Sequence, residues 1–123
     1  EKYVMEDKLK KVDQWPDEPP GSTRGLQLLA EAASEYFDVP LKDMKSKLRT
    51  NEVVWPRSVC MRLASYENYT STAIGEWWGK HHSSVLHAIK LVDSLRTAKP
   101  GYEKQFRRFA FFYKNYKRRV EKK

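Results

Sequence analysis

The chain has 123 residues, enough for one domain with a modest hydrophobic core. Its composition, 40% hydrophobic and 13% aromatic, is typical of a globular chain, and its single cysteine excludes an internal disulfide. The net charge of +8 favours a polyanionic partner. No apolar run approaches the length of a membrane span and no signal-peptide pattern opens the chain, so we expect a cytoplasmic protein at the nucleoid, with no membrane partner.

Positive charge gathers in two blocks of the chain. Residues 42–63 and residues 102–123 are strongly basic, whereas residues 1–41 are acidic. The two blocks flank a segment with the pattern of a helix-turn-helix, as expected for a surface that faces phosphate groups. Charge that serves only solubility is the alternative interpretation.

The first third of the chain predicts a linker and a core helix. Residues 1–13 carry a weak helical pattern, and residues 16–21 read as a linker because they contain three prolines. The opening segment is either a docking helix or the tail of a preceding region. Residues 24–37 predict a core helix and residues 41–44 a single helical turn. The apolar face of the core helix consists of Leu26, Leu29, Ala30, Ala33, Tyr36 and Phe37.

A basic loop follows at residues 45–51. It carries Lys45, Lys47 and Arg49 among small polar and apolar side chains. Such a loop is either a solvated surface loop or a contact for nucleic acid.

Residues 53–66 predict a second core helix. A proline is tolerated in the first turn of a helix, so Pro56 places the helix start near Trp55. Arg57 then lies at the positive end of the helix, where we expect it to bind phosphate. Cys60 falls within the apolar pattern and is expected to be a buried structural thiol.

Residues 70–97 have the pattern of a helix-turn-helix. A short helix precedes Gly79, which suits a turn with positive φ, and a longer helix is expected from about His82 to Thr97. In a major groove such a helix contacts base edges with its N-terminal residues. The candidate contacts are His81, His82, Ser83 and Ser84, with Lys80 as a phosphate contact and Lys90 as a weaker one. His87, one turn farther on, is expected to pack inward.

Residues 102–120 predict a last helix that is both aromatic and basic. Its stripe of Phe106, Phe109, Tyr113 and Tyr116 has helical spacing, which favours core packing over base stacking. This helix either closes the fold or holds a second copy of the chain.

Three of these segments, in this order, resemble the C-terminal DNA-binding domain (domain IV) of the bacterial replication initiator DnaA. The family signature Gly-Gly-Arg-Asp-His-Thr-Thr-Val-Leu-His-Ala is similar to Gly79-Lys80-His81-His82-Ser83-Ser84-Val85-Leu86-His87-Ala88, with one residue fewer at the turn. Residues 39–49 look like the basic loop of the family, and residues 55–64 look like its Pro-Arg helix. The resemblance covers roughly residues 23–97.

The resemblance implies an all-α, Trp-repressor-like helix-turn-helix bundle that binds specific double-stranded DNA in replication-origin or transcription control. It implies that Arg49 enters the minor groove while the recognition helix lies in the major groove. Thr72, among the expected DNA contacts, replaces the family's proline. His81 replaces an aspartate, and Ser83 and Ser84 replace threonines, which removes an acceptor and two methyl groups that can read bases. A changed or relaxed sequence preference is therefore an open alternative to the family's own.

We predict an N-terminal segment and linker over residues 1–21, the helix-turn-helix domain over residues 22–99, and a basic aromatic helix over residues 100–123 packed on it. No Gly-rich phosphate loop and no metal-ligand set is present, so we expect no enzyme, metal, cofactor or small-molecule substrate. The expected partner is double-stranded DNA, with other DNA-bound copies or an initiator protein as further candidates. Two alternatives stay open: a non-catalytic partner or antagonist of an initiator, and a single-strand or RNA binder that uses the C-terminal helix.

Overall fold

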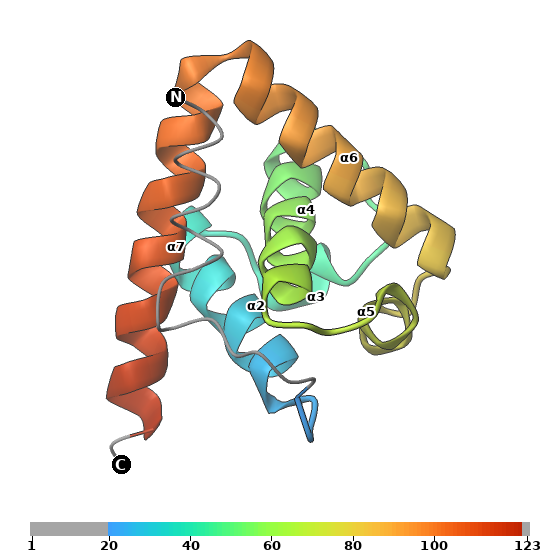
Figure 1. Ribbon diagram of the computed structural model, residues 1–123, viewed down its shortest axis with the longest axis vertical. Coiled ribbons are helices and arrows are strands. Elements are labelled where there is room, and N and C mark those ends of the chain that lie inside the picture. The colour runs from blue at the N-terminus through green and yellow to red at the C-terminus, as the bar shows by residue number, and fades with distance from the viewer. Residues whose placement is uncertain (1–19, 122–123) are drawn as a thin grey trace.

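The computed structural model describes residues 20–121, and within them the chain forms helices and no strand (Figure 1). In chain order these are α2 (Arg24–Phe37), α3 (Leu41–Met44), α4 (Asn51–Tyr66), α5 (Ser71–Trp78), α6 (His82–Ala98) and α7 (Pro100–Glu121). The prediction of an all-α bundle is confirmed. The helix expected over residues 1–13 and most of the expected linker lie outside the described residues. None of the described helices is long and apolar enough to cross a membrane.

The central helix of the bundle is α4. It contacts α2, α3, α5 and α6, and Figure 1 shows it surrounded by the other helices. Its side chains at Val59, Leu63 and Ala64 are fully buried. Cys60 is buried beside them, with its Sγ atom 3.5 Å from the carbonyl oxygen of Leu29. Burial raises the pKa of this thiol, and the prediction of a buried structural cysteine is confirmed.

α4 begins earlier than expected, and the placement of Pro56 in its first turn is wrong. Pro56 is the sixth residue of the helix. The helix starts where the carbonyl of Thr50 accepts hydrogen bonds from the N–H groups of Val53 and Val54, at 2.9 and 2.8 Å. Pro56 has no N–H to donate to the carbonyl of Glu52, but Glu52 is exposed, so water can replace the missing bond.

α7 closes the core against α2 and α6. Phe106, Phe109 and Tyr113 are fully buried, which confirms that the aromatic stripe is a packing surface. The Tyr113 hydroxyl donates to the carboxylate of Glu67, which is buried at the end of α4, and both carboxylate oxygens lie 3.0 Å away. Lys117 adds a third contact to this carboxylate at 3.4 Å. Burial and the Glu67 charge raise the pKa of Tyr113, so the hydroxyl keeps its proton as a donor.

The chain turns tightly between α5 and α6. Thr70 caps α5, with its hydroxyl oxygen 3.1 Å from the N–H of Ala73, and Gly79 ends it with φ of 72°, as expected for a turn glycine. The N–H of Lys80 donates to the carbonyl of Gly75 at 2.8 Å. A Cβ atom at Gly75 would lie 2.5 Å from the carbonyl oxygen of Lys80, so only glycine allows this approach.

Replacing Gly75 by alanine is expected to lower the free energy of unfolding by about 1–3 kcal/mol, because the new methyl group overlaps backbone atoms that cannot rotate away. Gly101→Ala is the matched control. Gly101 is also helical, and a Cβ atom there meets nothing within 4 Å, so its stability should be unchanged or higher by up to about 1 kcal/mol. Urea denaturation followed by circular dichroism measures both. Equal midpoints for the two variants would contradict the close approach of α5 and α6.

Candidate nucleic-acid interface

The loop between α3 and α4 is held in shape from within by Arg57. We call residues 45–50 the basic loop. The buried guanidinium of Arg57 donates from Nη1 to the carbonyl oxygens of Met44 and Ser46, at 3.2 and 3.0 Å, and from Nη2 to that of Leu48, at 2.7 Å. Because these are charge-assisted bonds to main-chain atoms, they fix the backbone of the loop. Lys47 and Arg49 project from it into solvent.

This geometry corrects the expected place of Arg57. The side chain does not lie at the positive end of α4 but one turn further in, where only 7% of the residue is exposed. Burial and the neighbouring Arg49 charge lower the pKa of Arg57 from its usual value. The sequence does not predict which way the Arg57 side chain points. Its acceptors are main-chain carbonyls, which every residue has, so the residue types do not reveal them.

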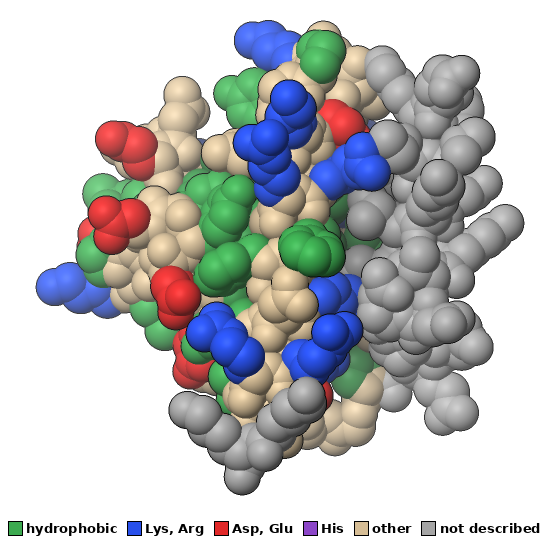
Figure 2. Space-filling model, turned by 90° about the vertical axis from the view of Figure 1, so that its left-hand side faces the viewer, with side chains coloured by type: hydrophobic (Ala, Val, Ile, Leu, Met, Phe, Trp, Pro, Cys, Tyr) green, Lys and Arg blue, Asp and Glu red, His purple; other side chains and the backbone are tan. Residues whose placement is uncertain are grey.

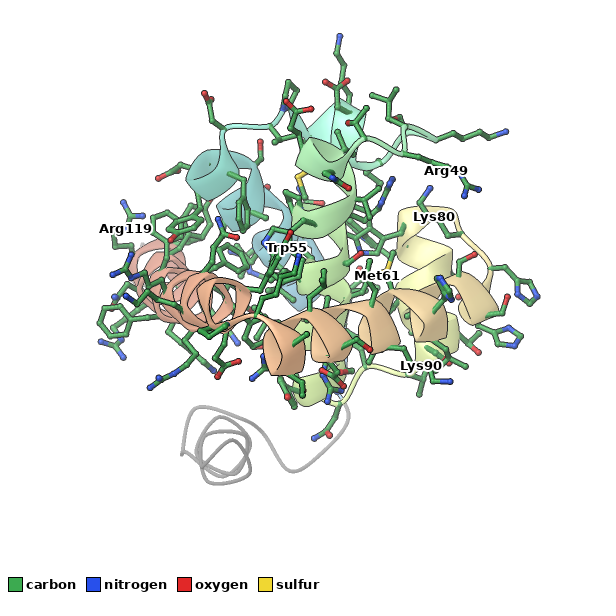
Figure 3. All side chains as sticks on the ribbon, turned by 90° about the horizontal axis from the view of Figure 1, so that it is seen from above. Arg49, Trp55, Met61, Lys80, Lys90 and Arg119 are labelled. Carbon is green, nitrogen blue, oxygen red and sulfur yellow. The ribbon has the colours of Figure 1, made fainter. Side chains whose placement is uncertain are left out.

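Two lysines tie the basic loop to the helix-turn-helix. Lys80, in the turn before α6, donates from Nζ to the carbonyl oxygen of Ser46 at 3.0 Å. The ammonium of Lys45 lies 3.9 Å from the ring centroid of Trp77 in α5, a cation–π contact. Figure 3 shows Arg49 and Lys80 close together at one end of the molecule. Loop and turn therefore present one continuous surface.

The electrostatics of this surface favour an anion. Within residues 20–121 no carboxylate forms an ion pair with Lys47, Arg49 or Lys80. Partial burial lowers the pKa of Lys80, and the charges of Arg57, Arg49 and Lys47 lower it further. The cations thus repel one another in the free protein, and a bound phosphate would relieve that repulsion.

The first turn of α6 is capped by a histidine. Nδ1 of His81 accepts from the N–H of Ser83 at 3.1 Å, and the Ser83 hydroxyl lies 2.8 Å from the same atom. An accepting Nδ1 places the proton of a neutral imidazole on Nε2, where it is free to donate outward. The ring of His82 packs against that of His81, with centroids 4.2 Å apart. The side chains of His81, His82, Ser83 and Ser84 are all exposed.

The exposed face of α6 contains two residues that the sequence did not assign to it. His87 is exposed, and the expectation that it packs inward is wrong, because Val85, Ala88 and Val92 occupy the inner face of the helix. Leu86 is 50% exposed beside it. Both follow Ser83 at spacings of three and four residues, the signal that would have placed them on its face.

The remaining predicted contacts lie around this centre. Thr72 is exposed in the first turn of α5. Lys90 is exposed farther along α6, and Figure 3 shows it apart from the neighbouring pair Arg49 and Lys80. The structure thus brings the basic loop to Lys80 and the start of α6, whereas Thr72 lies in α5 and Lys90 lies farther along α6.

The family model of the bacterial DnaA protein helix-turn-helix matches residues 26–92. The chain belongs to this family. The chromosomal replication initiator protein DnaA of Enterococcus faecalis is 36% identical over 89 residues, which cover 69% of this chain and 20% of that protein. The DnaA of Nitrosomonas europaea is 34% identical over 83 residues, 66% of this chain and 18% of its own length. That of Levilactobacillus brevis is 39% identical over 75 residues, 58% of this chain and 17% of its own length.

The matched region therefore spans about a fifth of the length of these DnaA relatives. The residues that the family model matches contain the basic loop, α4, α5 and the first part of α6. The resemblance inferred from three motifs is confirmed, and α5, α6 and the turn between them correspond to the helix-turn-helix of this family.

Arg57→Lys is expected to weaken duplex binding although the charge is kept. A lysine ammonium cannot reproduce the planar fork that reaches three carbonyls, so about 1.5–3 kcal/mol of stability is lost and the basic loop loses its fixed shape. Arg62→Lys is the matched control, since Arg62 lies on the same helix and pairs with Asp93 at 3.1 Å. Denaturation and fluorescence anisotropy measure the two effects. Unchanged duplex affinity in Arg57→Lys would contradict a role in presenting the loop.

His81→Asp is expected to separate stability from binding. A carboxylate can accept from the Ser83 N–H and interacts well with the helix N-terminus, so stability should rise by about 0.5–1 kcal/mol. Duplex affinity should fall because a negative charge enters the surface around Lys80. Melting curves and anisotropy on the same preparation test this. A fall in both quantities would mean that His81 does not act as the cap.

Proposed function

We propose that the chain binds double-stranded DNA with the first turn of α6 in the major groove and the basic loop in the adjacent minor groove. The observation that carries this proposal is the attachment of the basic loop to the helix-turn-helix through Lys80 and Lys45, while Arg57 of α4 fixes the shape of the loop. A recognition helix reads bases with its N-terminal residues. Because the loop is bound to that end, Arg49 is held beside α6 before DNA arrives.

The contacts divide into groups by their chemistry. Arg49 is the minor-groove residue, because its weakly hydrated guanidinium suits a narrow groove of negative potential. His82, Ser83 and Ser84 are base or phosphate contacts, and the half-exposed Leu86 can pack against a thymine methyl group. Phosphate contacts are assigned to Lys45, Lys47, Thr72, Lys80 and Lys90. Arg57 supports the loop and does not bind phosphate in this scheme.

The sequence preference is proposed to differ from that of the DnaA initiators. With Nδ1 accepting from the Ser83 N–H, His81 presents a donor at Nε2, whereas the aspartate of the family is an acceptor. Ser83 and Ser84 lack the methyl groups of the family's threonines. The phosphate contacts are independent of these changes. We therefore infer that the chain keeps its phosphate contacts with duplex DNA but prefers a different DNA sequence. Its role would lie in replication-origin or transcription control.

Arg49→Ala and Lys47→Ala are expected to affect DNA binding differently, the first on the preferred site and the second on all duplexes. Loss of Arg49 should cost about 1–3 kcal/mol on the preferred site and little on random duplex, because it removes groove readout. Loss of Lys47 should weaken all duplexes alike and reduce the salt slope by about one, because it removes a phosphate contact. Lys99→Ala is the control, an exposed lysine beyond the far end of α6. Equal losses from Arg49→Ala on specific and random DNA would overturn its role.

Fluorescence anisotropy tests the whole proposal. It compares random duplex with duplex that carries the binding site of the DnaA initiators (the box), at several salt concentrations. Equal and steeply salt-dependent binding to both duplexes indicates that the phosphate contacts are kept and the preferred DNA sequence has changed. Selection from a library of random duplexes then identifies that sequence. Tighter binding to the box refutes the altered preference. No duplex binding at low salt refutes the function itself.

A further inference from the structure

The outer face of α7 carries a second cationic surface with an exposed aromatic ring at its centre. Phe111 is 71% exposed, more than the other large exposed hydrophobic residues of the described chain, Leu48 and Leu86. Those two lie on the basic loop and on α6, within the candidate duplex-binding surface. Phe111 lies on neither. The fold does not need its ring, since the core contacts of α7 come from Phe106, Phe109 and Tyr113.

Cations surround Phe111 at helical spacing. Lys104, Arg107 and Arg108 precede it by one or two turns, and Arg118 follows it by two turns. Within residues 20–121 none of these four pairs with a carboxylate. We call Phe111 with these four cations the α7 outer face. Figure 2 shows Lys and Arg side chains gathered on this side of the molecule around exposed hydrophobic atoms.

Other cations of α7 are used differently. Lys117 lies 3.4 Å from the buried carboxylate of Glu67, and Arg119 lies 4.0 Å from that of Glu35. Lys117 therefore stabilises the packing of α7 on the end of α4, whereas the pair of Arg119 with Glu35 is exposed and contributes little to stability. The four cations of the α7 outer face do no such work, so their charge is available to a ligand.

This surface is separate from the helix-turn-helix. In Figure 1 α7 forms one edge of the molecule, whereas α5 and the start of α6 lie at the other. Figure 3 shows Arg119 of α7 on the opposite side from Arg49 and Lys80. A ligand of the α7 outer face can therefore bind while duplex occupies the helix-turn-helix.

We propose that the α7 outer face binds single-stranded nucleic acid, with a base stacked on Phe111 and phosphates held by Lys104, Arg107, Arg108 and Arg118. Aromatic rings among cations bind single strands because every unpaired base offers a π-face and every nucleotide a phosphate. A duplex keeps its base faces stacked on one another, so it satisfies the cations but leaves the ring exposed. An acidic protein segment supplies charge without a flat ring system for Phe111.

Truncation of α7 cannot test this proposal. Removal of the helix would expose the core that Phe106, Phe109 and Tyr113 complete, and binding would be lost with the fold. Point substitutions on the exposed face avoid this, because Phe111 makes no buried contact that the fold requires.

The experiment is anisotropy of the whole chain with labelled mixed-sequence single strands, as DNA and as RNA of the same sequence. Phe111→Ala is expected to weaken single-strand binding about tenfold, and Phe111→Trp to preserve or improve it. Arg107→Ala with Arg108→Ala should weaken it further and flatten its salt dependence. Duplex binding should be unchanged in the two Phe111 variants, because a duplex does not use the ring. A difference between the DNA and RNA arms identifies which strand the face prefers.

Arg119→Ala is the matched control, since it removes one charge from the same helix but from an ion-paired position. It should leave single-strand binding within about twofold. Single-strand affinity that is equal in the parent chain, Phe111→Ala and Phe111→Trp would overturn the proposal. So would displacement of the oligonucleotide by poly-glutamate from the parent and Phe111→Ala alike, which assigns the face to an acidic protein. The single-strand affinities and the poly-glutamate competition test this proposal whether or not the helix-turn-helix binds duplex.

Discussion

The basic loop depends on a buried guanidinium that has no carboxylate to neutralise it among the described residues. A charge removed from water requires hydrogen-bond partners, and Arg57 takes them from three main-chain carbonyls of the loop and its preceding turn. The carbonyl groups are acceptors only while the loop keeps its shape. Because dipoles rather than an opposing charge compensate Arg57, the surface above it keeps its positive potential. The same interaction therefore orders the loop and preserves its attraction for phosphate.

Cations in this domain fall into two populations. Arg96 is buried between Glu103, at 2.6 Å, and the ring of Phe106, and Lys117 is joined to Glu67, so each serves the packing of α7. Those of the basic loop and of the outer face of α7 lack carboxylate partners within residues 20–121. Arg57 apart, positive charge is thus paired with carboxylates where α7 meets its neighbours and left without them at two separate surfaces. This division is more specific than the excess of basic residues in the composition indicates.

The helices were predictable because each buries one periodic face, and residues 24–37 match the observed helix in both bounds. Gly79 was predictable because a positive φ favours glycine. Pro56 and Arg57 were misplaced for a shared reason: both depend on the surroundings of main-chain carbonyls, which residue types do not encode. His87 was misplaced although its spacing of four residues from Ser83 puts it on the exposed face of α6. The apolar pattern of a segment thus predicts its helix, while main-chain carbonyls distant in sequence decide how the side chain of Arg57 is oriented.

The one cysteine of the chain has a practical consequence for studying its motions. Cys60 lies inside the bundle against the Leu29 carbonyl, and its burial disfavours the thiolate that alkylating reagents require. A second cysteine introduced at an exposed position can therefore be labelled with a spectroscopic probe while the native thiol stays intact. Modification of Cys60 itself then requires separation of α2 from α4. The rate at which Cys60 is labelled in the unmodified chain therefore reports how often the core opens.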